Sequence, residues 1–596
     1  MARVPASAAP RPAVRPRPRP RWTVAPAPDA ALVASLAAGL QLPETVCQLL
    51  AVRGHRAVDT AKLYLRPRLD QLHAPDRLDG VASAAERLAT AVRRGETVLV
   101  HGDYDVDGMC STAIMVRVLR AVGGRVVPFI PDRLTDGYDL TDAGVRAAQA
   151  AGAVVVLTCD CGTSAHGPVA ALCAAGIDVI VSDHHLPGHG RDVPACHAVL
   201  NPNAPGTNYP DSDRGLCAAG VAFKLALAVV HALGVNDALV WRQLDLVALA
   251  TIADVAPLRG ENRVLARYGL KLMAESPNVG LRALVRAAGL DAKPLTAGRV
   301  GFILAPRLNA VGRLGSALRG VELLTTDDPH AANAIARELE ELNRRRQDLD
   351  RATLDAARRH VDRLDLDATY GLVIAGEGWH PGVIGIVASR VVEETGRPAV
   401  LVAVENGVGK GSGRSIPAFD LHDALAACDA RGLFRRFGGH KAAAGVTLDA
   451  VQVPAFAEAF AAVARERLTT DQLVPELRVD LEVPIDAVTD ALEATLRHLE
   501  PHGIGNAAPV LAVRGARLAA PPRPVGGDGV RLAFRTPDGG EIGAIGWGMI
   551  DRADGLDVHT PVDVAFRLER DDYRGADRLQ LRLADVAPAR AAAYAG

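Results

Sequence analysis

The chain has 596 residues, of which 49% are hydrophobic, and this predicts several domains with large cores rather than one domain or a disordered chain. Its 67 Lys and Arg residues against 69 Asp and Glu residues give a net charge of −2, which excludes a globally basic nucleic-acid-binding protein and leaves only local basic patches. The eight cysteines show no C-x-x-C pair or regular spacing, so we expect reduced thiols in a cytoplasmic protein. No apolar run is long enough to span a membrane.

Residues 1–39 are expected to form a Pro- and Arg-rich tail and lead-in. Up to about residue 28 the tail is low in complexity, and its alternating prolines keep it extended, so we expect neither a helix nor a sheet strand there. One interpretation is a basic arm that follows phosphates, and the other, which we favour, is a disordered tail. The segment lacks the apolar core of a secretory signal.

The pattern of residues 40–326 predicts a doubly wound parallel α/β domain. A helical pattern runs to residue 93, and strands and helices then alternate, which is typical of a parallel sheet with ligands at the carboxyl ends of its strands. The expected strands are 97–100, 125–130, 154–157, 178–181 and 197–200. The expected helices begin at Met109 and cover 164–175, 218–232 and 240–251.

Carboxylates and imidazoles follow directly after these apolar elements. The segment HGDYDVDG follows the first strand, TCDCG and SDHH follow two later ones, and ADVAP follows the helix that ends at residue 251. Because alternate residues of an extended segment point the same way, we expect His101, Asp105 and Asp107 to converge. Carboxylates this close repel one another unless a cation lies among them, and oxygen ligands with imidazoles suit Mn²⁺ or Mg²⁺. The simpler alternative for the first turn is a polar turn with a helix N-cap.

These four segments resemble the motifs of the DHH phosphoesterases, and the longer form with DYDVDG and a later APRLNAVGR is similar to the RecJ branch, whose members degrade single-stranded DNA from its 5′ end. The resemblance implies two Mn²⁺ or Mg²⁺ ions with Asp160 as the bridging ligand, and a hydroxide held between the ions that attacks phosphorus. It implies that His185 contacts the scissile phosphate or donates a proton. The implied metal ligands are His101, Asp105, Asp107, Asp160, His184 and Asp254.

Two further aspartates, Asp103 and Asp183, lie within the same motifs. They either orient ligating histidines and coordinated water or serve a purely structural purpose, and the sequence leaves both interpretations open. In the APRLNAVGR segment the side chains Arg307, Asn309 and Arg313 suit contacts with phosphate oxygens.

Residues 327–365 predict a long, charged helix that begins at Asp327-Asp328-Pro329 and bridges two domains, with a length of about 50 Å. Residues 366–468 then predict a smaller α/β domain with strands at 370–375 and 399–404 and two glycine-rich loops, GKGSGRS and GGHKAAAG. Both loops resemble the DHH-associated domain, which implies that they bind the terminal phosphate and bases of the substrate across from the metals. The implied residues are Ser412, Arg414, Ser415, Gly439 and His440.

Residues 469–596 predict an OB-like β-barrel. Its expected strands are 510–513, 530–535, 542–547, 562–568 and 579–584. Phe534, Trp547 and Tyr573, with Arg574 beside the last of them, are candidates for base stacking and phosphate contact. Burial in the core is an equally good interpretation for Phe534 and Trp547.

The favoured function is a metal-dependent 5′→3′ exonuclease that hydrolyses single-stranded DNA to 5′-mononucleotides in DNA repair and recombination. A phosphoesterase for short oligonucleotides, cyclic dinucleotides or nucleotide phosphates is the second hypothesis, and a scaffold that has lost its metals is the third. The substrate would be single-stranded DNA, with a helicase and a single-strand-binding protein as candidate partners. The resemblance suggests a monomer, and the sequence indicates no membrane association.

Overall fold

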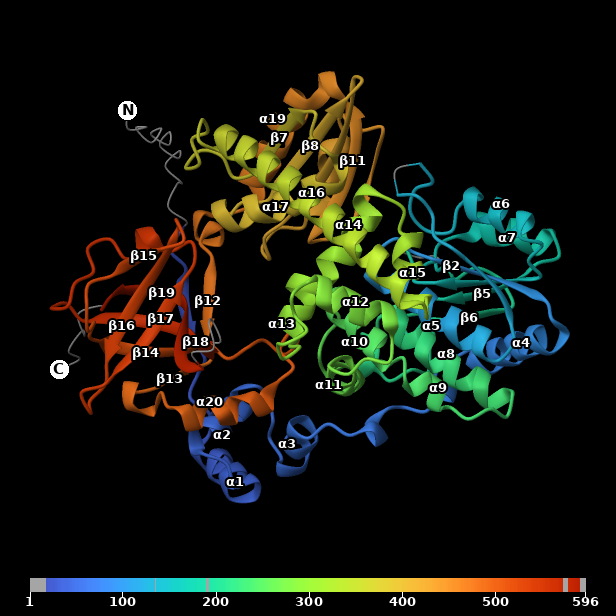
Figure 1. Ribbon diagram of the computed structural model, residues 1–596. Helices are drawn as coiled ribbons and strands as arrows, with labels where there is room; N and C mark the ends of the chain where they lie inside the picture. The colour runs from blue at the N-terminus through green and yellow to red at the C-terminus, as the bar shows by residue number, and fades with distance from the viewer. Residues whose placement is uncertain (1–17, 134, 189–191, 572–576, 590–596) are drawn as a thin grey trace, which may run out of the picture. The chain divides into compact units, whose positions relative to one another are not determined.

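The computed structural model describes residues 18–133, 135–188, 192–571 and 577–589 (Figure 1). They divide into two compact units, one made of residues 28–346 with 494–508 and the other of residues up to 27, 347–493 and from 509 onwards. The division falls inside helix α16 (Pro329–Val361), whose 33 residues correspond to about 50 Å and confirm the long helix expected from the sequence.

The first unit holds most of the helices and one parallel sheet. Its strands are β2 (Thr97–Gly102), β3 (Arg125–Phe129), β4 (Val155–Cys159), β5 (Asp178–Ser182) and β6 (Ala198–Leu200). Its helices up to residue 232 are α1 (Ala30–Leu40), α2 (Glu44–Val52), α3 (Val58–Leu65), α4 (Val81–Arg94), α5 (Val106–Ala121), α6 (Asp142–Ala150), α7 (His166–Ala174) and α8 (Ala218–Ala232). After these come α9 (Ala238–Trp241), α10 (Leu244–Ala253), α11 (Gly260–Met273), α12 (Val279–Ala287), α13 (Ala297–Arg299), a π-helix (Val300–Leu304), α14 (Ala305–Leu314) and α15 (Leu318–Thr325).

The sheet of the first unit has the order β3-β2-β4-β5-β6, and all neighbours are parallel. Figure 1 shows α6 and α7 on one side of this sheet and α4 and α8 on the other. Strand β2 has an apolar run because both of its faces are covered: Val98 and Val100 pack with α4, α5 and α8, and Leu99 packs with α6 and α7. The doubly wound parallel sheet expected from the sequence is confirmed.

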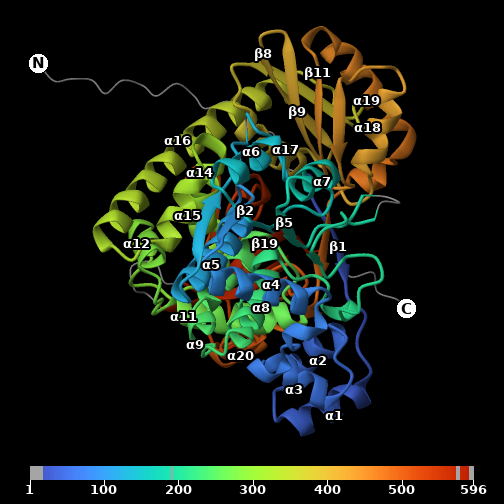
Figure 2. The same ribbon diagram turned by 90° about the vertical axis from the view of Figure 1, so that its right-hand side faces the viewer.

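The second unit contains a five-stranded sheet of order β10-β11-β9-β8-β7. The elements are β7 (Leu372–Glu377), α17 (Pro381–Thr395), β8 (Ala399–Glu405), β9 (Val408–Arg414), α18 (Leu421–Asp429), β10 (Arg436–Gly439), β11 (Ala443–Asp449) and α19 (Val453–Arg467). Helix α17 and the end of α16 share a core with one face of this sheet, and α18 and α19 share a core with the other (Figure 2).

A seven-stranded sheet of order β13-β14-β18-β19-β17-β16-β15 follows. The five strands expected from the sequence are present as β14 (Leu511–Ala516), β16 (Gly529–Arg535), β17 (Glu541–Gly546), β18 (Val562–Asp571) and β19 (Arg578–Pro588). The short strands β13 (Leu481–Glu482) and β15 (Arg523–Val525) extend its two edges, and α20 (Asp490–Leu496) lies between β13 and β14 in the chain.

The N-terminal expectation is wrong for part of the tail. Residues 21–24 form strand β1 (Arg21–Val24), which pairs in parallel with β12 (Glu476–Val479), and Trp22 donates its indole N–H to Asp585 at 2.7 Å. The run of prolines ends at Pro20, so the next four residues keep the N–H groups that a strand needs. Residues 1–17, with most of the arginine-rich run, lie outside the described residues.

All eight cysteines are free thiols, as the sequence predicted. Among the described residues, no single helix is both long and apolar enough to cross a membrane, and only the bent pair α1 and α2 passes that test when the two are taken together.

Candidate metal centre

The predicted ligands gather where the order of the parallel sheet reverses. Strand β2 comes first in the chain, β3 lies on one side of it and β4 on the other, so the loops after β2 and β4 leave the sheet toward opposite faces. Such a switch point leaves a crevice at the carboxyl ends of the strands, where α/β proteins bind their ligands. Asp103 and Asp105 follow β2, Asp160 follows β4, and His184 follows β5.

Two helix N-termini hold the aspartates that follow β2: that of α5 binds Asp105, and that of α8 binds Asp107. Asp105 is the N-cap of α5, and its Oδ1 accepts the N–H groups of Asp107 and Gly108 at 2.9 and 3.1 Å. The Asp107 carboxylate accepts the first two N–H groups of α8, from Ala218 and Ala219, at 2.7 and 2.8 Å. These donors fix Asp107 and favour its charge in a buried place.

Backbone strain is concentrated around the same crevice. Asp160 has φ +70°, Asp139 has φ +75° and Val255, directly after Asp254, has φ +62°. Only six non-glycine residues of the described chain have such values, and for a β-branched residue the conformation is a clear outlier. Strained conformations persist where the surroundings hold them for a functional reason, and here they set the direction of the Asp139 and Asp160 side chains.

Three overlapping groups of ligand atoms lie within 4.8 Å of one another. They are Asp103, Asp105 and Asp160; Asp107, His184 and Asp254; and Asp160, His184 and His185. His184 Nε2 links them, since it lies 3.2 Å from Asp160, 3.7 Å from Asp107 and 3.9 Å from Asp254.

Several buried atoms around His184 Nε2 have no hydrogen-bond partner. Asp103 Oδ1, Asp160 Oδ1 and His184 Nε2 are all in this state, although buried polar atoms are nearly always satisfied. Cations placed among them would supply the missing partners and would cancel the repulsion between the carboxylates. The donor set of carboxylate oxygens with imidazole nitrogen therefore fits divalent cations of the Mn²⁺ or Mg²⁺ type.

His101 does not fall within any of these groups, so its role as a metal ligand stays a prediction. Its ring lies 5.2 Å from that of Phe129, its Nδ1 lies 3.4 Å from Cys161 Sγ, and a side chain at Gly144 of α6 would collide with it. His101 belongs to β2 and shares a face with Leu99, whereas Asp105 lies beyond the end of the strand as the N-cap residue of α5. Its Nε2 is buried without a hydrogen-bond partner.

The two histidines of SDHH are fixed through their backbone. Asp183 accepts the N–H groups of His184 and His185 at 2.7 and 3.2 Å. Asn201 donates to the carbonyl of His185 at 2.9 Å, and Asn203 donates to the carbonyl of His184 at 2.6 Å. The sequence suggested an orienting role for Asp183, and the asparagines that complete this clamp were missed because an NPN segment looks like an ordinary turn.

The pKa values in the crevice reflect crowding of like charges. Burial and then the neighbouring carboxylates raise the pKa of Asp103 and Asp160 well above the usual range, and that of Asp254 to about 8. Burial would lower the pKa of His185, but the hydrogen bond and charge of Asp183 outweigh it and raise that pKa to about 9. Deprotonating these carboxylates at neutral pH therefore needs added positive charge.

Two residues of the APRLNAVGR segment already have protein partners. Arg307 donates to Glu340 at 2.6 Å, and the side-chain oxygen of Asn309 accepts the N–H of Val106 at 3.2 Å. The segment thus supports the loop that carries the aspartates. Any phosphate contact by Arg307 would compete with its ion pair.

The same segment approaches the aspartate loop through a glycine. Gly312 of α14 lies so close to the carbonyl of Tyr104 that any side chain there would collide with it. Arg313, the third predicted phosphate ligand, is the next residue of this helix.

The second unit brings several predicted phosphate-binding residues to one part of its own sheet. Ser412 and Arg414 lie on β9, and a side chain at Gly385, within the first two turns of α17, would come within 2.9 Å of Ser412 Oγ and 3.0 Å of an Arg414 nitrogen. Ser415 is different, because its hydroxyl donates to the carbonyl of Phe419 at 2.7 Å.

Gly439 and His440 lie at the turn between β10 and β11, and β11 pairs with β9. Gly439 has φ +141°, and His440 donates its N–H to the carbonyl of Ala443 at 2.8 Å. The two glycine-rich loops of the sequence are therefore parts of neighbouring strands.

The predicted base-stacking residues have different outcomes. Phe534 is fully buried in the C-terminal sheet, so a stacking role is wrong and the core interpretation is correct. Trp547 is 43% exposed and stays a candidate. Tyr573 and Arg574 lie outside the described residues.

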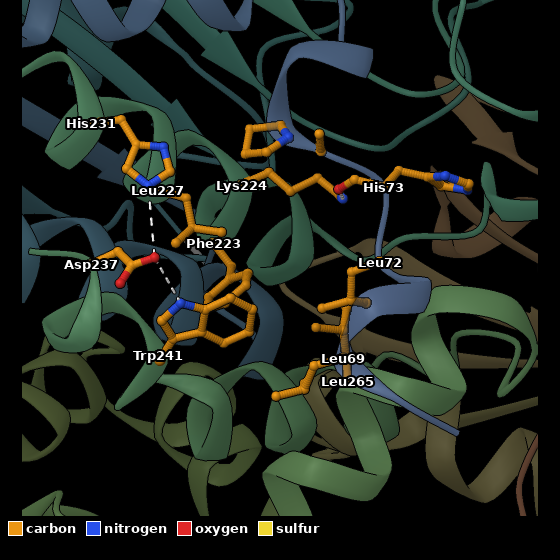
Figure 3. Close-up of a pocket in the computed structure, with 12 residues that line it drawn as sticks. Leu69, Leu72, His73, Phe223, Lys224, Leu227, His231, Asp237, Trp241 and Leu265 are labelled. Carbon is orange, nitrogen blue, oxygen red and sulfur yellow. Dashed lines mark hydrogen bonds and ion pairs between the residues drawn. The ribbon is translucent and has the colours of Figure 1, made fainter. Parts of the chain in front are cut away.

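A separate cavity of about 180 Å³ lies between the segment 69–75 and helices α8, α9 and α11 of the first unit (Figure 3). It is mostly apolar, and its polar groups are paired: Lys224 binds Glu261 at 2.7 Å, and Asp237 accepts the indole N–H of Trp241 at 3.0 Å. It shares no residue with the crevice at the strand ends.

Comparison with known families agrees with this architecture. The model of the DHH family N-terminal domain matches residues 97–251, that of the DHHA1 domain matches residues 368–466, and that of the RecJ OB domain matches residues 479–585. The fold and the crevice thus define a protein of the DHH class with a C-terminal OB domain.

Several relatives narrow this class. The single-stranded-DNA-specific exonuclease RecJ of Bacillus subtilis is 34% identical, over 95% of this chain and 71% of its own, and that of Thermus thermophilus is 37% identical over 95% and 78%. A crystal structure of RecJ from Thermus thermophilus in complex with Mn²⁺ matches with a TM-score of 0.82 at 36% identity, covering 96% of this chain and 80% of that one. The chain belongs to the RecJ family.

Proposed function

We propose that this protein is a metal-dependent exonuclease that removes 5′-mononucleotides from single-stranded DNA in repair and recombination. The observation that supports this most is the group of buried, unpartnered ligand atoms at the switch point of the sheet, in a chain of the RecJ family. The relatives named above are single-stranded-DNA-specific exonucleases, and one RecJ structure contains Mn²⁺.

The geometry supports a specific set of ligands for two ions. Asp103, Asp105 and Asp160 would hold one ion, and Asp107, His184 and Asp254 would hold the other, with Asp160 close to both groups. This set replaces the His101 of the sequence prediction by Asp103. Comparing Asp103→Asn with His101→Gln tests it: the first should weaken Mn²⁺ binding far more than the second, and the reverse order would refute it.

Bound at these side chains, the two ions would activate water and offset the charge that develops on the phosphate oxygens. The protein's own groups set the geometry for this step. The N-terminus of α8 fixes Asp107, the strained backbone directs Asp160, and the asparagine clamp fixes the two histidines. His185, with Asp183 on its Nδ1 at 2.8 Å, would contact the scissile phosphate.

The second unit supports a role in binding the phosphate at the 5′ end. The N-terminal turns of α17 offer backbone N–H groups, and Ser412 and Arg414 lie beside them. Arg414→Ala should therefore weaken binding of 5′-phosphorylated strands more than of strands with a 5′-hydroxyl. A cytoplasmic location, a monomeric state, and a helicase and a single-strand-binding protein as partners complete the proposal.

The decisive experiment follows products from a 3′-labelled, 5′-phosphorylated single strand with Mn²⁺. We expect a ladder that shortens from the 5′ end, little reaction on the matching duplex, and none in EDTA. The second hypothesis, a phosphoesterase for short oligonucleotides, predicts faster turnover of a dinucleotide than of the long strand. That result would overturn our proposal, and the C-terminal OB domain argues against it.

A further inference from the structure

Tyr138, which belongs to none of the predicted sets of site residues, directs its hydroxyl at the crevice. It lies in the loop between β3 and α6 and is 48% exposed, yet its Oη lies 2.9 Å from His185 Nε2. The two rings meet edge to face, at 78° and 6.0 Å between centroids. A tyrosine whose purpose was base stacking would have no need to commit its hydroxyl to this histidine.

The hydroxyl completes the fixation of the His185 imidazole. Asp183 Oδ1 occupies the other ring nitrogen, Nδ1, at 2.8 Å, and Asp183 is almost fully buried. Both ring nitrogens therefore have one partner each, on opposite sides of the ring. With the ring held at two points, its orientation is set before any substrate binds.

The loop that carries Tyr138 is itself tied to the metal centre. Its neighbour Asp139 adopts the left-handed conformation, and the Asp139 carboxylate accepts the N–H groups of Leu140 at 2.8 Å and Gly162 at 2.7 Å. Gly162 is part of the TCDCG segment that presents Asp160. This local strain at a non-glycine residue, held by a hydrogen bond to the neighbouring motif, places Tyr138 at a defined distance from His185.

We propose that Tyr138 is a positioning residue for the hydrolytic step: its hydroxyl sets the orientation in which the His185 imidazole meets the scissile phosphate, and Nε2 is then shared between that hydroxyl and a phosphate oxygen. The inference rests on the proposed nuclease function and adds to it a residue outside the motif segments quoted above. It assigns Tyr138 a role in turnover and not in DNA affinity, because the hydroxyl faces the histidine. The competing role, stacking of the exposed ring on a base, predicts a change in DNA affinity and not in turnover.

The experiment separates these roles with Tyr138→Phe, which keeps the ring and removes the hydroxyl. We expect kcat on single-stranded DNA to fall about 10- to 100-fold, the range typical of lost outer-shell contacts. The Kd for the same strand, measured with Ca²⁺ under conditions where no product forms, should stay within twofold of wild type. Tyr370→Phe in the second unit is the matched control, because it also removes one 2.9 Å phenol hydrogen bond, to Thr470, and should leave both values unchanged.

Two outcomes would overturn the inference. One is a Tyr138→Phe protein with wild-type kcat, and the other is a fall in kcat that a weaker Kd explains in full. A melting temperature equal to that of wild type verifies that the variant is folded, which its half-exposed position favours. Failure of the wild-type protein to degrade single strands would instead contradict the proposed function, so the two failures are distinguishable.

Discussion

Two groups of histidine and carboxylate side chains in the first unit have similar composition but different partners. The group at the strand ends contains buried atoms with no hydrogen-bond partner, as described above. The other group, made of His73, Asp213 and Glu261, also brings its ligand atoms within 4.8 Å of one another. By composition and spacing alone, either could be taken for a metal site.

The second group is fully satisfied by the protein. Lys224 donates to Glu261 at 2.7 Å, Tyr209 donates its hydroxyl to the other oxygen of the same carboxylate, and His73 Nε2 lies 3.0 Å from Asp213. A lysine ammonium takes the place that a cation would have. The difference teaches that unpaired atoms, and not the residue types, identify the metal centre.

The largest effect is expected for Asp160→Asn, which removes one charge from the centre of the first group. Because Asp160 lies close to both sets of ligands, we expect kcat to fall by about 10³-fold. Product ladders at saturating Mn²⁺ measure this, with the melting temperature as a check of folding. A variant that keeps a near-normal rate would show that the centre lies elsewhere.

Next in size is the loss of the lysine from the second group, Lys224→Met. Glu261 would remain buried without its counter-charge, so the free energy of unfolding should fall by about 3–5 kcal/mol, measured by denaturant titration. The double variant Lys224→Met with Glu261→Gln should recover part of this loss. If Mn²⁺ restored the stability of the single variant to that of wild type, the two groups would not differ as we argue.

A smaller effect is expected from pH on Mn²⁺ binding. The carboxylates of the first group have raised pKa values, about 8 for Asp254, so protons compete with the metal below that pH. The apparent affinity for Mn²⁺ should rise between pH 6.5 and 7.5, by up to about tenfold for each proton displaced. Titration calorimetry in buffers of different ionisation enthalpy measures both the affinity and the protons released.

The metal-free protein should show the opposite trend in stability. A carboxyl with a raised folded pKa keeps its proton while the unfolded chain loses it, so stability falls as pH rises from 6.5 toward 8. His185, with a pKa of about 9, acts in the same direction, and His101, with a pKa lowered by burial to about 4, opposes this trend only near pH 6.5, where its imidazole in the unfolded chain is still partly protonated. A melting temperature that rises with pH would contradict this account.

Much of the fold and most of the centre could be predicted from the sequence because both are local. Apolar runs that end in carboxylates and histidines place those side chains at strand ends, and parallel strands bring their carboxyl ends to one edge. Asp160 and His184 were found in this way, Asp254 was found at the end of an apolar helix, and the three are confirmed as neighbours.

The misses have identifiable physical causes. The convergence of His101 with Asp105 and Asp107 stays a prediction, because the alternation of side chains along β2 ends with the strand at Gly102. Phe534 could have been assigned to the core, since Val530, Leu532 and Phe534 are buried along β16 and alternate with exposed Arg531, half-buried Ala533 and exposed Arg535. Nothing in the sequence indicated Tyr138 as a site residue, because its partner His185 lies 47 residues away and only the folded loop brings the two together.

The smallest expected effect belongs to Asp213→Asn in the second group. An asparagine keeps an acceptor oxygen for the N–H of Glu261, now 2.9 Å away, and loses the ionic part of the contact with His73 and an exposed acceptor for the Ser212 hydroxyl. The rate on single-stranded DNA and its dependence on Mn²⁺ should stay within twofold of wild type, while the melting temperature falls slightly. Because this variant removes a carboxylate charge just as Asp160→Asn does, it is also the matched control for that variant. A changed Mn²⁺ requirement would mean that the satisfied group binds metal as well, and partner counting would then fail as a criterion.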